Sequence, residues 1–283
     1  MEQELAQRAV AGQDGEPVPA DGAGTVVGLL VEDDPVVLLH REPGGEASGG
    51  LAASAEDLFL TQEQSGAAGG GSGIGRAAAL RFADEGASVL IADINGDAAK
   101  QVAEEIQAAG GTALAVVGDL NAGIMDGMNA AADVTDAEWE RVLRINPTAP
   151  FLLTRAALPH LIAKSKGAIV NTASEAGLHG SAAGAAYTAS KHGIVGLTRS
   201  TAIMYRSVGV RTNAIAPGAT ITYIGLDLKE GAYGPSILAA YMGNIGRVSE
   251  AEEQAAAIVF LASDAASNIN GVVLPVGNGW SAV

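Results

Sequence analysis

The pattern of apolar and polar residues changes near residue 66. Beyond it, short β-favouring apolar runs alternate with longer helical segments, which is typical of parallel strands joined by helices. The pattern therefore predicts a doubly wound parallel sheet with helices on both faces. The expected strands are 88–92, 112–117, 168–171, 210–216 and 272–276, and the expected helices are 76–85, 97–109, 139–162 (one helix, or two broken near Pro147 and Pro150), one around residue 187, and 250–263.

Residues 1–65 form a different kind of sequence. They are rich in glycine, alanine and acidic residues, and residues 1–24 have the composition of a flexible tail. Thr25–Val31 and Val36–His40 are short apolar runs that could form a hairpin. Because an isolated hairpin is marginal in water, it would either dock on the main domain or stay mobile. We expect an extension over 1–65 and a catalytic domain over 66–283.

Composition narrows the classes of function. The net charge of −16 argues against a nucleic-acid or anionic-membrane partner. The chain has no cysteine, which excludes disulfides and thiolate chemistry, and no His/Asp/Glu cluster has metal-ligand spacing. Neither a signal peptide nor a membrane-spanning apolar run is present in the sequence, so a cytoplasmic protein is expected.

The stretch GGGSGIG at residues 69–75 precedes an expected helix. Glycines allow a tight turn and close approach of the backbone to a pyrophosphate, which the amino end of a helix attracts. A flexible Gly/Ser linker is the alternative, because 38 of the 283 residues are glycine. A strand and an acidic residue follow at the distance typical of a dinucleotide-binding unit, so we expect a dinucleotide site.

Asp93 ends the strand that follows this loop. A carboxylate there can accept hydrogen bonds from the adenosine ribose and repels a 2′-phosphate, which favours NAD over NADP. The alternative is an aspartate that only caps the turn after the strand.

Tyr187 and Lys191 stand four positions apart in an expected helix. This spacing puts both side chains on one face, where the ammonium would lower the pKa of the phenol and prepare it for acid/base work. The same spacing also occurs by chance in helices, so the surrounding motifs matter.

Taken together, these stretches resemble the short-chain dehydrogenase/reductase family over about residues 66–283. Gly69, Gly73 and Gly75 match its Gly-x-x-x-Gly-x-Gly loop, and residues 121–123 match its Asn-Ala-Gly motif. The resemblance implies a Rossmann-like sheet and the catalytic residues Asn146, Ser174, Tyr187 and Lys191. The cofactor-binding residues that it implies are Gly69, Ser72, Gly73, Ile74, Gly75, Asp93, Asp119, Leu120, Asn121, Ala122, Gly123, Tyr187, Lys191, Pro217, Gly218 and Thr222.

Two departures from the family pattern concern the centre of the sheet. Residues 62–68, before the glycine loop, are poor strand material, and the sequence at residue 120 lacks a strand and helix that the family has there. The strand at 112–117 could serve twice, or the N-terminal hairpin could fill a gap. We therefore expect an altered or incomplete sheet centre.

The resemblance implies hydride transfer between NAD(H) and a secondary alcohol or ketone, with Tyr187 as acid/base and Lys191 lowering its pKa. Ser174 would bind the substrate oxygen, and Asn146 would hold a water that links Lys191 to solvent. Ser174 could instead only cap a turn. His179 and Tyr223 are tentative substrate residues, and the segment 223–242 looks like a lid.

Three hypotheses about activity remain open from the sequence. The leading one is an NAD-dependent dehydrogenase or reductase acting on a small or medium-sized, largely apolar alcohol or ketone. The others are a non-catalytic NAD-binding protein with a disrupted sheet, and a dehydratase or epimerase. The resemblance also implies a homodimer or homotetramer that pairs through helices at 151–163 and 187–206.

Overall fold

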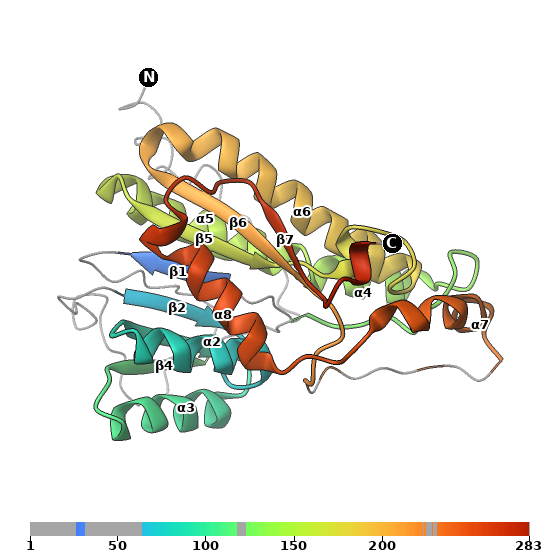
Figure 1. The fold of residues 1–283 in the computed structure, drawn as a ribbon, viewed down its shortest axis with the longest axis horizontal. Coiled ribbons are helices and arrows are strands. Elements are labelled where there is room, and N and C mark those ends of the chain that lie inside the picture. Colours follow the sequence, from blue (N-terminus) through green and yellow to red (C-terminus); the bar gives the residue numbers. More distant parts are fainter. Residues whose placement is uncertain are drawn as a thin grey trace, which may run out of the picture.

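The computed structural model describes residues 27–31, 64–117, 123–222, 224, 228 and 231–282. These residues form one seven-stranded sheet with helices on both faces (Figure 1). The strands are β1 (Val27–Val31), β2 (Gln64–Ala68), β3 (Ser88–Asp93), β4 (Ala113–Val117), β5 (Gly167–Thr172), β6 (Val210–Pro217) and β7 (Val273–Val276). The α-helices are α2 (Gly73–Asp84), α3 (Gly96–Ala108), α4 (Asp136–Ile145), α5 (Thr148–Lys164), α6 (Ala185–Tyr205), α7 (Tyr233–Leu238) and α8 (Ala251–Ala262). Short 3-10 helices are η2 (Glu175–Gly177), η3 (Arg206–Val208), η4 (Ala239–Ile245), η5 (Asp264–Ala266) and η6 (Trp280–Ala282).

The strand order is β4-β3-β2-β1-β5-β6-β7. Neighbours are parallel within β4-β3-β2 and within β5-β6-β7. β1 lies between these groups and is antiparallel to both, with Gly28 opposite Ala67 on one side and Val170 on the other. This is the order of a dinucleotide-binding sheet, with β1 in the fourth position.

The centre of the sheet is altered, as expected, because an antiparallel strand lies there. The expectation for the residues before the glycine loop is different from what the structure shows. A strand does precede the glycine loop, so the expectation that the sheet lacks this strand is wrong. Pairing on both sides of β2 outweighs the weak strand preference of its small residues. The N-terminal segment docks through β1, and its direction means that the sheet is not wholly parallel. Residues 36–40, the second half of the expected hairpin, lie outside the described residues.

The strand β4 does not serve two positions. Within the described residues it pairs with β3 alone, at the edge of the sheet. The central gap is therefore filled by the N-terminal alternative, because β1 supplies hydrogen-bonding partners to β2 and β5 together.

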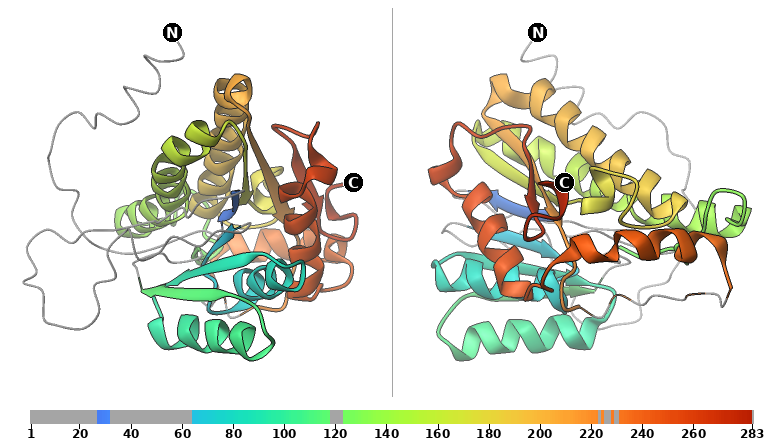
Figure 2. Two further views of the ribbon diagram at one scale, coloured as in Figure 1. Left: turned by 90° about the vertical axis from the view of Figure 1, so that its left-hand side faces the viewer. Right: turned by 45° about the vertical axis from the view of Figure 1, so that its right-hand side comes forward.

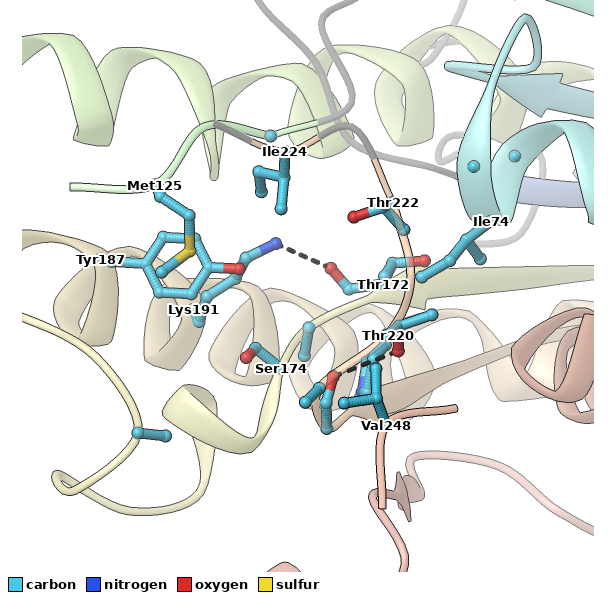
Figure 3. A pocket seen from close by; sticks show the side chains of 18 of the residues that line it. Ile74, Met125, Thr172, Ser174, Tyr187, Lys191, Thr220, Thr222, Ile224 and Val248 are labelled. Carbon is cyan, nitrogen blue, oxygen red and sulfur yellow. Dashed lines mark hydrogen bonds between the residues drawn. The ribbon is translucent and has the colours of Figure 1, made fainter. Parts of the chain in front are cut away.

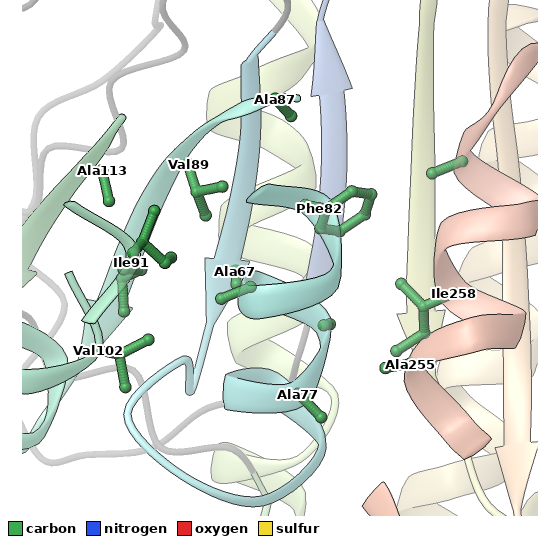
Figure 4. Close-up of a cluster of buried hydrophobic side chains, with 14 of the residues drawn as sticks. Ala67, Ala77, Phe82, Ala87, Val89, Ile91, Val102, Ala113, Ala255 and Ile258 are labelled. Atoms are coloured by element: carbon green, nitrogen blue, oxygen red, sulfur yellow. The ribbon is translucent and has the colours of Figure 1, made fainter. Parts of the chain in front are cut away.

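Helices cover the two faces of the sheet in separate groups, with α5 and α6 on one face and α2, α3 and α8 on the other (Figure 2). The second face holds the larger apolar cluster (Figure 4). Phe82 of α2, Ile91 of β3 and Ile258 of α8 are at most 1% exposed there. Burial of such side chains contributes about 1.5–3 kcal/mol each and fixes α2, which follows the glycine loop.

The expected helix over 139–162 is two helices. α4 ends at Ile145 and α5 begins at Thr148, with Asn146 and Pro147 between them. Proline has no amide hydrogen, so Pro147 cannot continue the helical hydrogen-bond ladder and the break falls at this point. The other predicted elements differ from the observed ones by a few residues at their ends, and α2 begins earlier than expected, at Gly73.

The parallel strands bring the predicted site residues to one edge of the sheet. β2 leads into the glycine loop, β3 ends at Asp93, β5 leads to Ser174, and β6 ends at Pro217. The carboxyl edge of such a sheet is where open α/β folds bind ligands. Among the described residues, none of the helices has the length and apolar character needed to cross a membrane.

Candidate active site

The glycine loop has the geometry of a phosphate cradle. Gly69 and Gly73 have positive φ angles of 66° and 51°, which other residues rarely adopt. A Cβ on Gly75 would lie 2.1 Å from the Gly69 carbonyl oxygen, so only glycine fits there. The first amides of α2 have no acceptor within the helix, and the positive end of its dipole lies at the loop.

Asp93 lies beside this loop at the end of β3. Its Oδ2 accepts a hydrogen bond from Gly71 N at 2.9 Å, and its Oδ1 accepts one from Asn95 N at 2.8 Å. The carboxylate therefore caps the turn, as the alternative interpretation held, and it also lines the adjoining cavity. The two roles are compatible, because each carboxylate oxygen can accept a second hydrogen bond.

A cavity of about 550 Å³ connects the glycine loop to the catalytic helix. Figure 3 shows the side chains of Ser174, Tyr187 and Lys191 gathered at this cavity with those of Ile74 and Thr222. The structure thus brings most of the predicted residues to one site. Those that line the cavity are Ser72, Gly73, Ile74, Gly75, Asp93, Gly123, Ser174, Tyr187, Lys191, Pro217, Gly218 and Thr222.

Other predicted residues are not among those lining the cavity. Gly69 begins the glycine loop and has a positive φ angle. Asn146 and His179 do not line the cavity, and their contacts are described below. The predicted residues Asp119, Leu120, Asn121, Ala122 and Tyr223 lie outside the described residues.

Tyr187 and Lys191 form the buried pair at the centre of the site. Their exposed fractions are 7% and 3%. The Lys191 ammonium lies 5.4 Å from the centroid of the Tyr187 ring, and its Nζ donates to the Thr172 carbonyl at 3.2 Å. The i and i+4 spacing on α6 has therefore brought a phenol and an ammonium into one volume.

The expected net lowering of the Tyr187 pKa does not occur in this structure, because burial outweighs it. Burial raises the pKa of Tyr187 to about 12, a hydrogen bond with Ser174 lowers it, and the charge of Asp126 raises it. Burial also lowers the pKa of Lys191 to about 8. At neutral pH the pair is a neutral phenol beside an ammonium.

Ser174 both caps a turn and faces the tyrosine. Its Oγ accepts from Ala176 N at 3.2 Å, which caps the start of η2. The same hydroxyl also interacts with the Tyr187 phenol, which lowers the pKa of Tyr187. Two hydroxyl groups thus meet at one place on the cavity wall, where a substrate oxygen could bind both.

Asn146 links two segments of the site through hydrogen bonds. Its carboxamide is fully buried, and it accepts from Ile124 N at 2.9 Å and donates to Ile124 O at 3.0 Å. It also donates to Ser190 Oγ at 2.9 Å, and Ser190 Oγ donates to the Tyr187 carbonyl at 2.7 Å. These contacts join the segment after the Asn-Ala-Gly motif to α6.

His179 contacts residues of the turn that follows Ser174. One ring nitrogen lies 3.1 Å from Glu175 Oε2, and the other lies 3.1 Å from Ser181 Oγ. Glu175 is 1% exposed, and the His179 ring centroid lies 6.0 Å from that of Trp280. The histidine therefore supports the turn that follows Ser174.

The part of the cavity beyond Tyr187 is apolar. Met125, Ala182 and Trp280 pack in one cluster with Tyr187, and Met125 lies by the phenol ring in Figure 3. Sequence reasoning missed most of this wall; the apolar residues directly after the Asn-Ala-Gly motif were the available signal. Apolar residues that line the cavity include Met125, Met128, Ala182, Ile224, Met242, Ile245, Val248 and Trp280.

The turn after β6 is fixed by hydroxyl and amide groups. Thr220 Oγ1 lies 3.0 Å from Ser249 Oγ, and Ser249 Oγ donates to the Ala219 carbonyl at 3.1 Å. Gln254 of α8 donates to Ser249 Oγ at 2.9 Å. The chain that follows the predicted lid segment thus returns to the turn next to Gly218. Among the residues described, no group of three metal-ligating side chains occurs.

Comparison with known proteins agrees with this geometry. The family profile described as short chain dehydrogenase matches residues 67–121, and the profile described as Enoyl-(Acyl carrier protein) reductase matches residues 120–281. The chain is 38% identical over 245 residues to 3beta-hydroxysteroid dehydrogenase 2 of Eggerthella lenta, covering 76% of this chain and 93% of that protein. It is 36% identical over 228 residues to cyclohexanol dehydrogenase of an Acinetobacter species, covering 72% and 88%.

Solved structures resemble the fold as well. A protein of Beutenbergia cavernae assigned as an NAD(P) dependent gluconate 5-dehydrogenase has a TM-score of 0.67 and 37% identity, covering 76% of this chain and 95% of that one. Levodione reductase has a TM-score of 0.67 and 32% identity, covering 76% and 96%. With the glycine loop and the buried Tyr187–Lys191 pair on one cavity, these matches establish that the chain belongs to the short-chain dehydrogenase/reductase family.

Proposed function

We propose that the protein is an oxidoreductase that transfers a hydride between NAD(H) and a secondary alcohol or ketone. The observation that carries this proposal is the buried Tyr187–Lys191 pair, which shares one cavity with Ser174 and the glycine loop. The relatives named as dehydrogenases of a hydroxysteroid and of cyclohexanol support the same reaction class.

In the proposed mechanism, Tyr187 exchanges the proton with the substrate oxygen. Its pKa of about 12 keeps the phenol protonated at neutral pH, so it can donate to a carbonyl oxygen. The Lys191 ammonium stabilises the phenolate that this transfer leaves behind, and Ser174 donates to the charge that develops on the substrate. A bound nicotinamide supplies or accepts the hydride, while these residues move the proton.

The residues present fit a dinucleotide. The close approach of Gly75 to Gly69 leaves room for a pyrophosphate only with glycine at that point, and amides at the start of α2 can donate to it. Pro217, Gly218 and Thr222 would hold the nicotinamide end. Of the residues described as lining the cavity, Lys191 is the only basic one, and the ribose end carries the Asp93 carboxylate instead. This supports a preference for NAD over NADP, although the Beutenbergia cavernae protein has NADP bound at low occupancy.

The substrate part of the cavity supports an uncharged, largely apolar substrate. Methionines, isoleucine, valine and tryptophan surround the two hydroxyl groups, and a sugar acid would need a cation there. We therefore infer an alicyclic secondary alcohol or the matching ketone as the substrate class, in preference to gluconate.

A direct assay tests this function. The full chain would be incubated with NAD+ or NADP+ and cyclohexanol, a 3β-hydroxysteroid or gluconate, and the reduced nicotinamide would be followed by absorbance. Turnover with an apolar cyclic alcohol and NAD+ is expected. Saturable NADH binding without turnover across a broad panel of alcohols and ketones would favour the non-catalytic alternative. Product formation with no net redox change would favour a dehydratase or epimerase.

Assembly, location and domain boundaries are further proposals. Phe151 on α5 and Ile203 and Met204 on α6 are 44%, 55% and 69% exposed, which supports pairing through these helices into a homodimer or homotetramer. Size-exclusion chromatography with light scattering would test this state. A cytoplasmic location would be tested by cell fractionation, and limited proteolysis would test the division into 1–65 and 66–283.

A further inference from the structure

An acidic residue outside the cavity contacts the backbone of the catalytic tyrosine. Asp126 is 2% exposed, and it follows Met125 in the segment between the Asn-Ala-Gly motif and α4. Its Oδ2 accepts a hydrogen bond of 2.8 Å from Tyr187 N. Its Oδ1 accepts hydrogen bonds from Gly184 N at 3.3 Å and from Met128 N at 3.0 Å.

These contacts cap the amino end of α6 with a side chain from elsewhere in the chain. The N-cap residue of α6 is Gly184, which has no side chain to bond the first amides. Those amides need acceptors when they are buried, and Asp126 supplies a charged one. A Cβ on Gly184 would lie 2.5 Å from Asp126 Oδ2, so the absence of a side chain at Gly184 is what admits the carboxylate.

The segment that carries Asp126 is held from a second side. Glu138 of α4 accepts from Gly127 N at 2.9 Å and from Asn129 Nδ2 at 2.9 Å, and the Asn129 carbonyl accepts from Ala185 N at 3.0 Å. The segment therefore has a fixed position on α6.

The residues on either side of this contact form part of the substrate wall. Met125 and Met128 both line the cavity, while the Asp126 carboxylate between them is directed at the helix. One residue thus connects the apolar wall with the backbone of Tyr187.

We propose that Asp126 is a positioning residue for proton transfer: it fixes Tyr187 relative to the Met125–Met128 wall and places a negative charge at the amino end of the helix that carries the phenol. This inference rests on the proposed oxidoreductase function for its kinetic consequences. Asp126 does not line the cavity, so it acts through Tyr187 and not on the substrate.

The charges around the phenol define the electrostatic part of this role. Lys191 faces the ring from α6, and Asp126 bonds the backbone nitrogen of Tyr187 at the amino end of that helix. Glu175 and His179 follow Ser174 on the η2 side. Burial raises the pKa of Asp126, its three backbone donors lower it, and Glu138 raises it. The Asp126 charge contributes to the raised pKa of Tyr187, so its removal should make the phenol more acidic.

The first test is amide hydrogen exchange in the wild-type chain. Tyr187 N lies in the first turn of α6, where an amide without a capping acceptor exchanges readily. We expect slow exchange of this amide at neutral pH. Exchange as fast as that of a frayed helix end would overturn the inference, whether or not the protein turns over any alcohol.

The second test uses Asp126→Asn, with Asp133→Asn as the matched control, because Asp133 is exposed in the same segment. We expect kcat to fall about tenfold to a hundredfold in Asp126→Asn, with a smaller change in KM, because the tyrosine is displaced. The pH at which alcohol oxidation reaches half its maximal rate should also move to lower pH. A lower kcat with an unmoved midpoint would support the positioning role and overturn the charge effect.

Gly184→Ala provides an independent variant. It keeps the Asp126 charge but displaces the carboxylate, so kcat should fall while the pH midpoint stays near that of the wild type. Unchanged kcat and midpoint in Asp126→Asn, or unchanged kcat in Gly184→Ala, would overturn the inference. Absence of turnover in the wild type would instead count against the proposed function.

Discussion

The Lys191 ammonium lies 5.4 Å from the centroid of the Tyr187 ring, with both side chains almost fully buried. Burial disfavours the charged form of each group, so it shifts their two pKa values in opposite directions. It raises the pKa of Tyr187 to about 12 and lowers that of Lys191 to about 8. At neutral pH the Tyr187 phenol can therefore donate its proton beside a charged Lys191. This transfer becomes less favourable as Lys191 loses its charge.

Replacement of Tyr187 by phenylalanine removes the proton donor and keeps the ring. General acid/base groups contribute about 10²–10⁴ in rate, so we expect kcat to fall by that factor with little change in NADH affinity. Steady-state assays and NADH fluorescence titration would measure the two effects. Tyr205→Phe, at the other end of α6, is the matched control. Full turnover by Tyr187→Phe would refute the assigned role.

The pH dependence of ketone reduction should follow Lys191. Reduction requires the protonated phenol and is helped by the ammonium, and the ammonium is lost as pH rises through about 8. We expect kcat/KM for a cyclic ketone to be highest below that pH and to fall above it, since kcat/KM reports groups of the free enzyme. A profile that stays level up to about pH 10 would show that the Lys191 charge does not matter.

The part of the site that could be predicted from the sequence is the part encoded locally. Tyr187 and Lys191 share a helix, and the glycine loop and Asp93 belong to one strand-helix-strand unit, so spacing alone places them. The contact of Asp126 with Tyr187 spans 61 positions and depends on how two segments pack. The raised pKa of Tyr187 depends on burial, which spacing does not reveal.

The centre of the sheet shows a similar division. Apolar runs predicted β3, β4, β5, β6 and β7, because these strands carry their own preference for the extended state. β2 contains glycine and alanine, and it is a strand because β1 and β3 pair with it on both sides. The direction and position of β1 are long-range properties of the whole sheet, which local preference does not encode.

Lys191→Met should stabilise the protein at neutral pH while abolishing activity. Folding lowers the lysine pKa from 10.5 to about 8, so the buried ammonium costs stability below about pH 8. Between these two pKa values the unfolded chain binds more protons than the folded protein. The free energy of unfolding of the wild type should therefore rise with pH in this range. We expect the variant to exceed the wild type by on the order of 2 kcal/mol at pH 7, less the lost hydrogen bond to Thr172.

Urea unfolding at about pH 7 and about pH 9.5 would measure this difference in the free energy of unfolding. The gap between Lys191→Met and wild type should shrink at the higher pH. Above about pH 10 the raised pKa of Tyr187 acts in the other direction, because the folded state then binds more protons and stability falls. An equal gap at both pH values would contradict the burial of a charged lysine.

Asp93→Asn should weaken the preference for NAD. The variant keeps the size of the side chain and removes the charge that repels a 2′-phosphate, so the ratio of NADPH to NADH affinity should rise about tenfold. Titration with both reduced cofactors measures the ratio, which cancels any shared loss from the weakened hydrogen bonds to Gly71 and Asn95. Asp97→Asn, exposed in the first turn of α3, is the control. An unchanged ratio would assign Asp93 to turn capping alone.

Deletion of residues 1–31 should destabilise the whole domain, because it removes β1 from the middle of the sheet. β2 and β5 would each lose an antiparallel partner, and their freed backbone groups would lie in the centre of the sheet. Several lost ladder bonds imply a decrease of about 3 kcal/mol or more in the free energy of unfolding. Deletion of residues 1–24 leaves β1 intact and is the matched control. Urea midpoints measure both, and equal midpoints for the two truncations would mean that β1 is not needed to complete the sheet.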